Sequence, residues 1–218
     1  MINITHALSP FITCPFKCPF CCAKDNVTNS NVELTSDYWD NLESSINGGQ
    51  YKNIMLTGDT EPTLFHDWLK RIVELSDKYN LINELRTHNY SFHPSDIHFN
   101  QVWYSITDAD YLVNLPQLWK HGMQFSDEVN FAILINKDFK VEDIIKVRKL
   151  LPESKITIRY LMDECGSDDI AKWIIDNEHT FDIASEELLQ SYNIRINKCY
   201  LSEYDIIRQD GKIYHEWQ

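Results

Sequence analysis

Four of the six cysteines in this 218-residue chain lie in one short N-terminal segment, "CPFKCPFCC". Three residues separate Cys14 from Cys18, two separate Cys18 from Cys21, and Cys22 follows directly. Thiolates bind zinc, usually as four ligands, and they also hold iron–sulfur clusters. A cubane cluster held by three thiolates leaves one iron open to another ligand. The spacing therefore predicts either a cluster held by three of these thiols or a zinc or iron–sulfur site that includes Cys22.

A second segment that could do chemistry is "MLTGDTEPTL", residues 55–64, which begins as a short apolar run and then becomes polar. Glycine, aspartate, threonine and proline are common turn formers, so an ordinary connection between a strand and a helix would also account for it. The carboxylate of Glu61 and the carbonyl groups of such a turn suit an ammonium group, because charge-assisted hydrogen bonds are strong. The segment is therefore a candidate for binding a positively charged group.

Together, the two segments resemble those of the radical S-adenosylmethionine (SAM) enzyme superfamily. Cys14, Cys18 and Cys21 stand in its CxxxCxxC pattern, with an aromatic residue before the last cysteine, and "GDTEPTL" is similar to its glycine-rich turn after the second strand. Asp59 and Thr60 depart from the family, in which small glycines are common at these positions. Their side chains limit how closely a ligand can approach the backbone.

The resemblance implies two cofactors: a [4Fe-4S] cluster held by Cys14, Cys18 and Cys21, and SAM bound through its methionine amine and carboxylate at the open iron. One-electron cleavage of SAM would give methionine and a 5′-deoxyadenosyl radical that abstracts hydrogen from a substrate. In the family, a polar residue near the end of the fourth strand often contacts the ribose hydroxyl groups. The residues that the resemblance places at SAM are Phe20, Gly58, Asp59, Thr60, Glu61, Ser105 at the fourth strand and Asn136 at the fifth.

The elements that must position these residues follow from hydrophobic patterns. Short apolar or β-branched runs predict strands at 2–7, 53–58, 84–89, 102–107, 131–136 and 155–162. Helical spacing lies between them, with a start at Ser36 and apolar stripes at 68–79 and 144–151. Strands separated by helices predict right-handed crossovers and a parallel sheet. The expected fold class is α/β, a partial (βα)6 open barrel with parallel strands and functional groups at the strand ends.

The pattern changes near the C-terminus. Residues 1–162 are predicted to form the barrel core, and residues 163–218 a short C-terminal α+β extension of the same domain. In the extension, "DDIAKWIIDN" and "SEELLQ" have helical patterns, and Asp210-Gly211 between alternating runs predicts a hairpin. Its two cysteines, Cys165 and Cys199, are isolated, so we expect buried thiols there and no second cluster.

Composition narrows the function classes. Twenty Lys plus Arg against 33 Asp plus Glu give a net charge of -13, which repels a phosphate backbone and makes a nucleic-acid partner unlikely. A hydrophobic share of 43% is typical of a globular protein. No apolar run approaches the ~20 residues of a membrane span, and the N-terminus lacks the features of a secretory signal. We therefore expect a cytoplasmic protein with no membrane segment.

The expected activity is that of a radical SAM enzyme acting on a small molecule or a peptide, in biosynthesis or peptide modification. The resemblance also implies a one-electron donor such as flavodoxin or ferredoxin. The Glu-Pro-Thr-Leu sequence at 61–64 favours this activity over that of a glycyl-radical-enzyme activase, which stays open as an alternative. A non-catalytic zinc or iron–sulfur binding module is the other alternative. The sequence selects neither a substrate nor a role for His88, which follows the third predicted strand.

Overall fold

The computed structural model describes most of the chain between residues 34 and 160 and shorter stretches on either side. The described residues are 4–8, 14–16, 18, 21, 34–48, 51–57, 60–160, 172, 175–177, 180–197, 205–207 and 212–214. Strands β1 to β6 are Ile4–Leu8, Asn53–Thr57, Ile82–Thr87, Phe99–Ile106, Ser126–Ile135 and Ile156–Tyr160. Helices α1, α2, α3, α4 and α6 are Ser36–Gly48, His66–Lys78, Leu115–Gly122, Val141–Leu150 and Ile183–Ser191.

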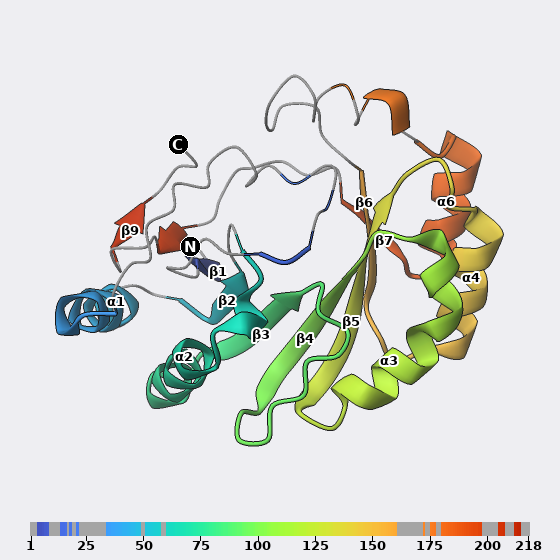
Figure 1. Cartoon of the computed structure of the whole chain (residues 1–218). Helices are drawn as coiled ribbons and strands as arrows, with labels where there is room; N and C mark the ends of the chain where they lie inside the picture. Colours follow the sequence, from blue (N-terminus) through green and yellow to red (C-terminus); the bar gives the residue numbers. More distant parts are fainter. Residues whose placement is uncertain are drawn as a thin grey trace.

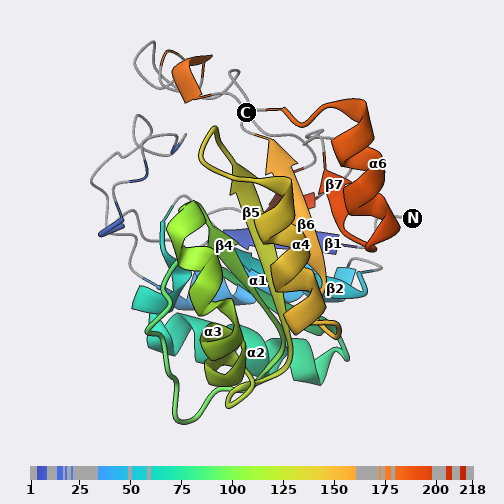
Figure 2. The same ribbon diagram turned by 90° about the vertical axis from the view of Figure 1, so that its right-hand side faces the viewer.

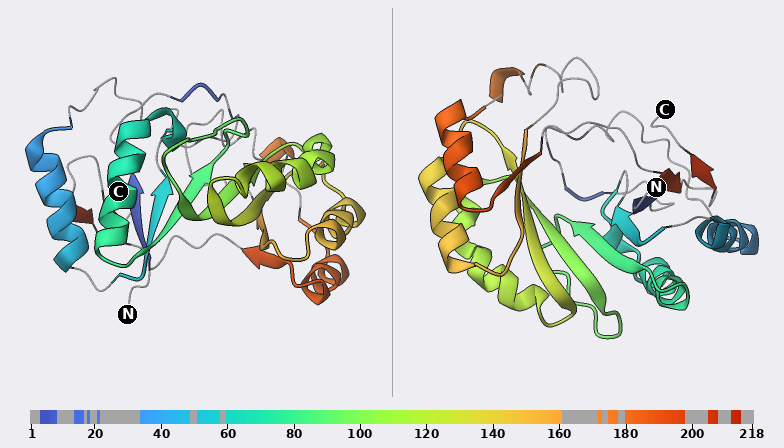
Figure 3. Two further views of the ribbon diagram at one scale, coloured as in Figure 1. Left: turned by 90° about the horizontal axis from the view of Figure 1, so that it is seen from below. Right: turned by 180° about the vertical axis from the view of Figure 1, so that it is seen from behind.

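The six strands form one parallel sheet, in which each strand pairs with its neighbours in chain order. Strand β7 (Arg195–Asn197) extends the sheet beside β6, and β8 (Asp205–Ile207) extends it beside β1. Strand β9 (Ile213–Tyr214) pairs antiparallel with β8. The sheet is curved, and the helices lie along its convex side (Figure 1 and, from behind, Figure 3). The fold is therefore the predicted open α/β half-barrel.

The hydrophobic core lies between the sheet and the helices because alternate strand residues face the helical layer. Phe131, Ile133 and Ile135 of β5 are fully buried in the same cluster as the apolar stripe of α2. Figure 2 shows α4 and α6 in front of the part of the sheet formed by β5, β6 and β7. The intervening strand residues project from the concave face, where the register places Trp103 beside Asn130. This concave face is more polar than the helix-facing one.

The structure confirms the six predicted strands, the helix start at Ser36 and the apolar stripe of α2. The "SEELLQ" segment lies within α6, and β8 with β9 forms the predicted antiparallel pair. The Asp210-Gly211 turn and most of the "DDIAKWIIDN" segment lie outside the described residues. None of the helices in the described ranges combines the length and apolar character that a bilayer-crossing segment needs.

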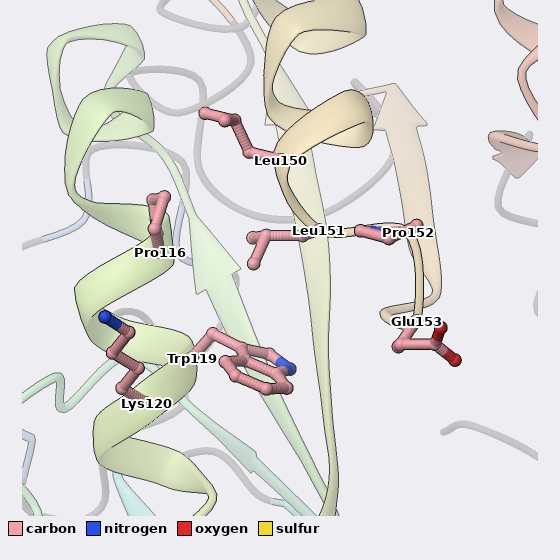
Figure 4. A pocket seen from close by; sticks show the side chains of 7 residues that line it. All are labelled: Pro116, Trp119, Lys120, Leu150, Leu151, Pro152 and Glu153. Atoms are coloured by element: carbon pink, nitrogen blue, oxygen red, sulfur yellow. The ribbon is translucent and has the colours of Figure 1, made fainter.

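The prediction that residues 144–151 form a buried apolar stripe is wrong for Leu150. Ile144, Val147 and Leu151 are buried, but Leu150 is 66% exposed at the end of α4. It lies at the edge of a cavity of about 170 Å³, which α3 and the segment from α4 to β6 enclose (Figure 4). None of the residues predicted to bind a cofactor lines this cavity.

Gly122 allows α3 to end close against the sheet, and its substitution tests this packing. A Cβ atom at Gly122 would lie 2.7 Å from Cγ2 of the buried Val129 and 3.2 Å from a ring carbon of Tyr104. Because valine is stiff at χ1, we expect Gly122→Ala to lower the free energy of unfolding by about 1–3 kcal/mol. Urea unfolding followed by circular dichroism measures this loss.

The control is Gly48→Ala at the end of α1, where an added Cβ meets no atom within 4 Å. We expect this variant to change stability by no more than about 0.5 kcal/mol. Equal stability of the two variants would show that α3 does not pack as described.

Candidate functional site

Glu61 lies at the centre of a hydrogen-bonded cluster where β2 and β3 end. Its side chain is 3% exposed. Oε1 accepts hydrogen bonds from the Thr63 backbone N–H (3.1 Å), the Thr63 hydroxyl (2.8 Å) and the Thr87 hydroxyl (2.7 Å). Oε2 accepts one from the backbone N–H of His88 (3.0 Å). The carboxylate therefore joins the C-terminal ends of two neighbouring strands.

The local sequence explains how Glu61 reaches this position. Its backbone is extended (φ -93°, ψ 108°), and Pro62 begins a short 3-10 turn, Pro62–Leu64, which Glu61 caps. Proline suits a first helical position because its fixed φ is already helical and it has no N–H group to satisfy. Asn89 completes the cluster by donating its backbone N–H to the Thr87 hydroxyl (2.8 Å) and its side-chain amide to the Thr63 hydroxyl (2.9 Å).

The described cysteines lie beside this cluster. Cys18 and Cys21 are half-buried, and the Cys21 N–H donates to the Cys18 carbonyl at 3.2 Å, which forms a tight turn. Cys14 is an exposed residue, yet partial desolvation raises the pKa of its thiol, and the nearby charges of Glu61 and Cys21 add to this. Backbone hydrogen bonds at Phe16 and Glu61 oppose the rise in pKa. The two segments that carry the family resemblance therefore meet in space.

An aromatic group connects the cysteine segment to β4. The ring of Phe16 meets His88 edge-on, with centroids 5.0 Å apart. His88 Nδ1 lies 2.9 Å from the Ser105 carbonyl oxygen, which only accepts hydrogen bonds, so this nitrogen carries the proton. The Tyr90 hydroxyl donates to the same oxygen at 2.7 Å, and its ring stacks on Tyr111.

Burial raises the pKa of Tyr90, with further contributions from Tyr111, Cys18 and Asp108. The phenol therefore stays protonated and keeps donating to the Ser105 carbonyl group. The influence of Cys18 on this pKa also places Tyr90 in the neighbourhood of the cysteines. Sequence reasoning missed Tyr90, because it stands in the loop after β3, where no hydrophobic period marks its partners.

The structure describes only some of the other residues that were predicted to contact SAM. Ser105 is half-buried on β4, and Thr60 is half-buried beside Glu61 in the chain. Asn136 donates from its amide to the Thr107 carbonyl (3.2 Å) and accepts from the Asp138 N–H (2.9 Å), so its side chain shapes the loop after β5. The first of these bonds connects Asn136 to the residue that follows β4. Phe20, Gly58, Asp59 and Cys22 lie outside the described residues.

No three His, Cys, Asp or Glu side chains within the described ranges converge in the way that a single metal ion requires. Cys14, Cys18 and Cys21 form no disulfide.

Removal of the Glu61 charge tests the cluster. Glu61→Gln would replace one carboxylate oxygen with an amide NH₂ group, which donates hydrogen bonds. This group would face a buried N–H or O–H donor, which would then lack an acceptor. We expect the free energy of unfolding to fall by about 1–3 kcal/mol, as measured by urea titration. Glu74→Gln on the exposed face of α2 is the matched control, with an expected change of no more than about 0.5 kcal/mol. Equal effects of the two substitutions would mean that Glu61 does not organise these strand ends.

No family model and no curated protein matches the sequence. Among solved structures, Streptococcus suis SuiB bound to the precursor peptide SuiA aligns with 97% of this chain, with a TM-score of 0.69 and 14% identity. Native anSMEcpe with bound AdoMet aligns with 98% (TM-score 0.59, 13% identity), as does its complex with AdoMet and the Kp18Cys peptide (0.60, 14%). The chain spans 59% of SuiB and 74% of anSMEcpe. The chain therefore has the fold of these proteins.

Proposed function

We propose that the chain is a radical SAM enzyme that abstracts hydrogen from a peptide or another small substrate. In this proposal Cys14, Cys18 and Cys21 hold a [4Fe-4S] cluster, and SAM binds at its open iron. The observation that carries the proposal is the meeting of Cys14 with the Glu61 turn at the strand ends of an open parallel half-barrel. The likeness to a structure that contains AdoMet supports it.

The residues present fit an iron–sulfur cluster. Three thiols that form no disulfide stand close together in the sequence after the first strand, and Cys14 receives backbone hydrogen bonds at Phe16 and Glu61. Hydrogen bonds to cysteine sulfur and restricted solvent access are two ways in which proteins set the potential of a cluster. When bound, the cluster supplies the electron that cleaves SAM into methionine and a 5′-deoxyadenosyl radical.

The chain's own residues would hold and orient SAM. Oε2 of Glu61 accepts a hydrogen bond from the His88 backbone N–H, and a carboxylate oxygen can accept a second one, which is proposed to come from the methionine ammonium group. Ser105 lies on the concave face and is proposed to contact the ribose, with Asn136, directly after the next strand, as a second polar group. Phe20, Gly58, Asp59 and Thr60 are proposed to complete the contacts. Phe16, His88 and Tyr90 would form a largely apolar wall that excludes water from the reacting atoms.

A peptide is the favoured substrate class. The SuiB structure contains a precursor peptide, and one anSMEcpe structure contains a peptide together with AdoMet. The concave face of this sheet is polar and carries no described helix, so it is the face proposed to receive the substrate (Figure 1). A protein of the flavodoxin or ferredoxin class is the proposed electron donor.

Alanine substitution of single cysteines tests the ligand set. We expect Cys14→Ala, Cys18→Ala and Cys21→Ala each to lose the brown colour, most of the iron and all formation of 5′-deoxyadenosine. The reason is that each of the three thiolates would hold a different iron of the cluster. The measurements are iron analysis and product chromatography after anaerobic reconstitution with dithionite and SAM.

Cys22→Ala is the matched control, because Cys22 is adjacent to Cys21 but lies outside the three-cysteine spacing. We expect it to retain iron and to form 5′-deoxyadenosine. Loss of iron in this variant, or a colourless wild-type protein with one zinc per chain, would instead support a metal-binding module that uses four thiolates.

A further inference from the structure

Arg159, on β6, differs from the other arginines that the structure describes in detail. Its Nε is buried, and within the described ranges it has no hydrogen-bond acceptor and no acidic side chain forms an ion pair with the guanidinium. In contrast, Arg86 pairs with Glu84 and lies 4.3 Å over the Trp103 ring, and Arg148 donates to the Tyr192 carbonyl. A half-buried guanidinium normally has an anionic or carbonyl partner, because removal of its hydration is costly.

The strand pattern determines where Arg159 points. Ile156 and Ile158 are buried in the core beneath the helices, and the Tyr160 hydroxyl donates to Glu186 of α6. Since strand side chains alternate between faces, Arg159 projects from the concave face.

The register places Arg159 near the mouth of the half-barrel. Thr157 pairs with Ala132, which pairs with Ser105, so these three residues form one row across the concave face. Arg159 stands two residues further toward the C-terminal end of β6, one row nearer the mouth. It therefore lies at the end of the barrel where the proposed cofactors bind.

We propose that Arg159 binds a carboxylate of the substrate. This inference rests on the proposed function and adds the chemical class of the substrate: a peptide with an acidic side chain or free C-terminus, or a small carboxylic acid. The guanidinium presents two parallel N–H donors that match the two oxygens of a carboxylate.

SAM also has a carboxylate, but the proposed cofactor arrangement places it elsewhere. In that arrangement its amine and carboxylate would bind at the cluster that Cys14, Cys18 and Cys21 would hold, after β1. Strands β2, β3, β4 and β5 lie between β1 and β6 in the sheet. The proposal thus assigns the carboxylate at Arg159 to the other reactant, and labelling in the presence of SAM alone separates the two sources.

Arginine labelling with phenylglyoxal, followed by peptide mass spectrometry, tests this on the holoprotein saturated with SAM. The probe is N-acetyl-L-glutamate α-amide, and N-acetyl-L-glutamine amide is its neutral counterpart. We expect the acidic probe to slow labelling of Arg159 about sixfold at a concentration of about five times its Kd. The neutral probe and SAM alone should leave the rate unchanged. Arg71, exposed on α2, serves as the internal control that no addition protects.

Calorimetric binding of the same probe gives a second measurement. We expect Arg159→Gln to weaken binding roughly 10- to 100-fold and Arg159→Lys to weaken it less, because lysine keeps the charge without the paired donors. Thermal melts of both variants should match the wild type.

Three results would overturn the inference. Protection of Arg159 by SAM alone would mean that the cofactor supplies the carboxylate. Equal protection by the acidic and the neutral probe would mean that binding at Arg159 does not require a carboxylate. Failure of Arg159 to react in the SAM-loaded protein, with a lower melting temperature for Arg159→Gln, would reveal an internal ion pair. Labelling needs no turnover, so these results are distinct from a failure of the cluster or of SAM cleavage.

Discussion

The buried carboxylate of Glu61 is the interaction on which the site depends. It accepts four hydrogen bonds from Thr63, Thr87 and His88, and so it holds the end of β2 against the end of β3. A buried charge without such donors would be strongly unfavourable, so the turn, the threonine hydroxyls and the strand ends stabilise one arrangement together. Cys14 contacts the backbone of this arrangement. The position of the cysteine segment therefore depends on a carboxylate that is distant from it in the sequence.

The Glu61 cluster lies at the strand ends of an open, curved sheet. Helices α1, α2, α3, α4 and α6 lie on the convex side, and the polar strand residues face the concave side (Figure 1). The two edges of the sheet are extended by strands from the C-terminal part of the chain, β7 beside β6 and β8 beside β1. Residues predicted as an appended extension thus take part in the same sheet. The last described residues consequently flank the concave side at both edges.

The sequence was sufficient to predict elements whose signal is local. Alternating and continuous apolar runs marked the six strands, and the spacing of Cys14, Cys18 and Cys21 marked the metal centre that we propose. The bonds from Thr87 and His88 to Glu61 span 26 and 27 residues, and only the parallel register brings them together. Leu150 fits a helical stripe and is exposed nonetheless, at the last position of α4, where it lines the cavity beside α3. The pairing of β7 with β6 and of β8 with β1 also depends on tertiary contacts, which no local sequence pattern indicates.

The central claim is that three cysteines hold an iron–sulfur cluster whose open iron binds SAM. Electron paramagnetic resonance of the anaerobically reduced holoprotein, recorded with and without SAM, tests it most directly. The account predicts the signal of a reduced [4Fe-4S] cluster whose g-values shift when SAM is added, because SAM becomes a ligand of one iron. A cluster signal that saturating SAM leaves unchanged would contradict it.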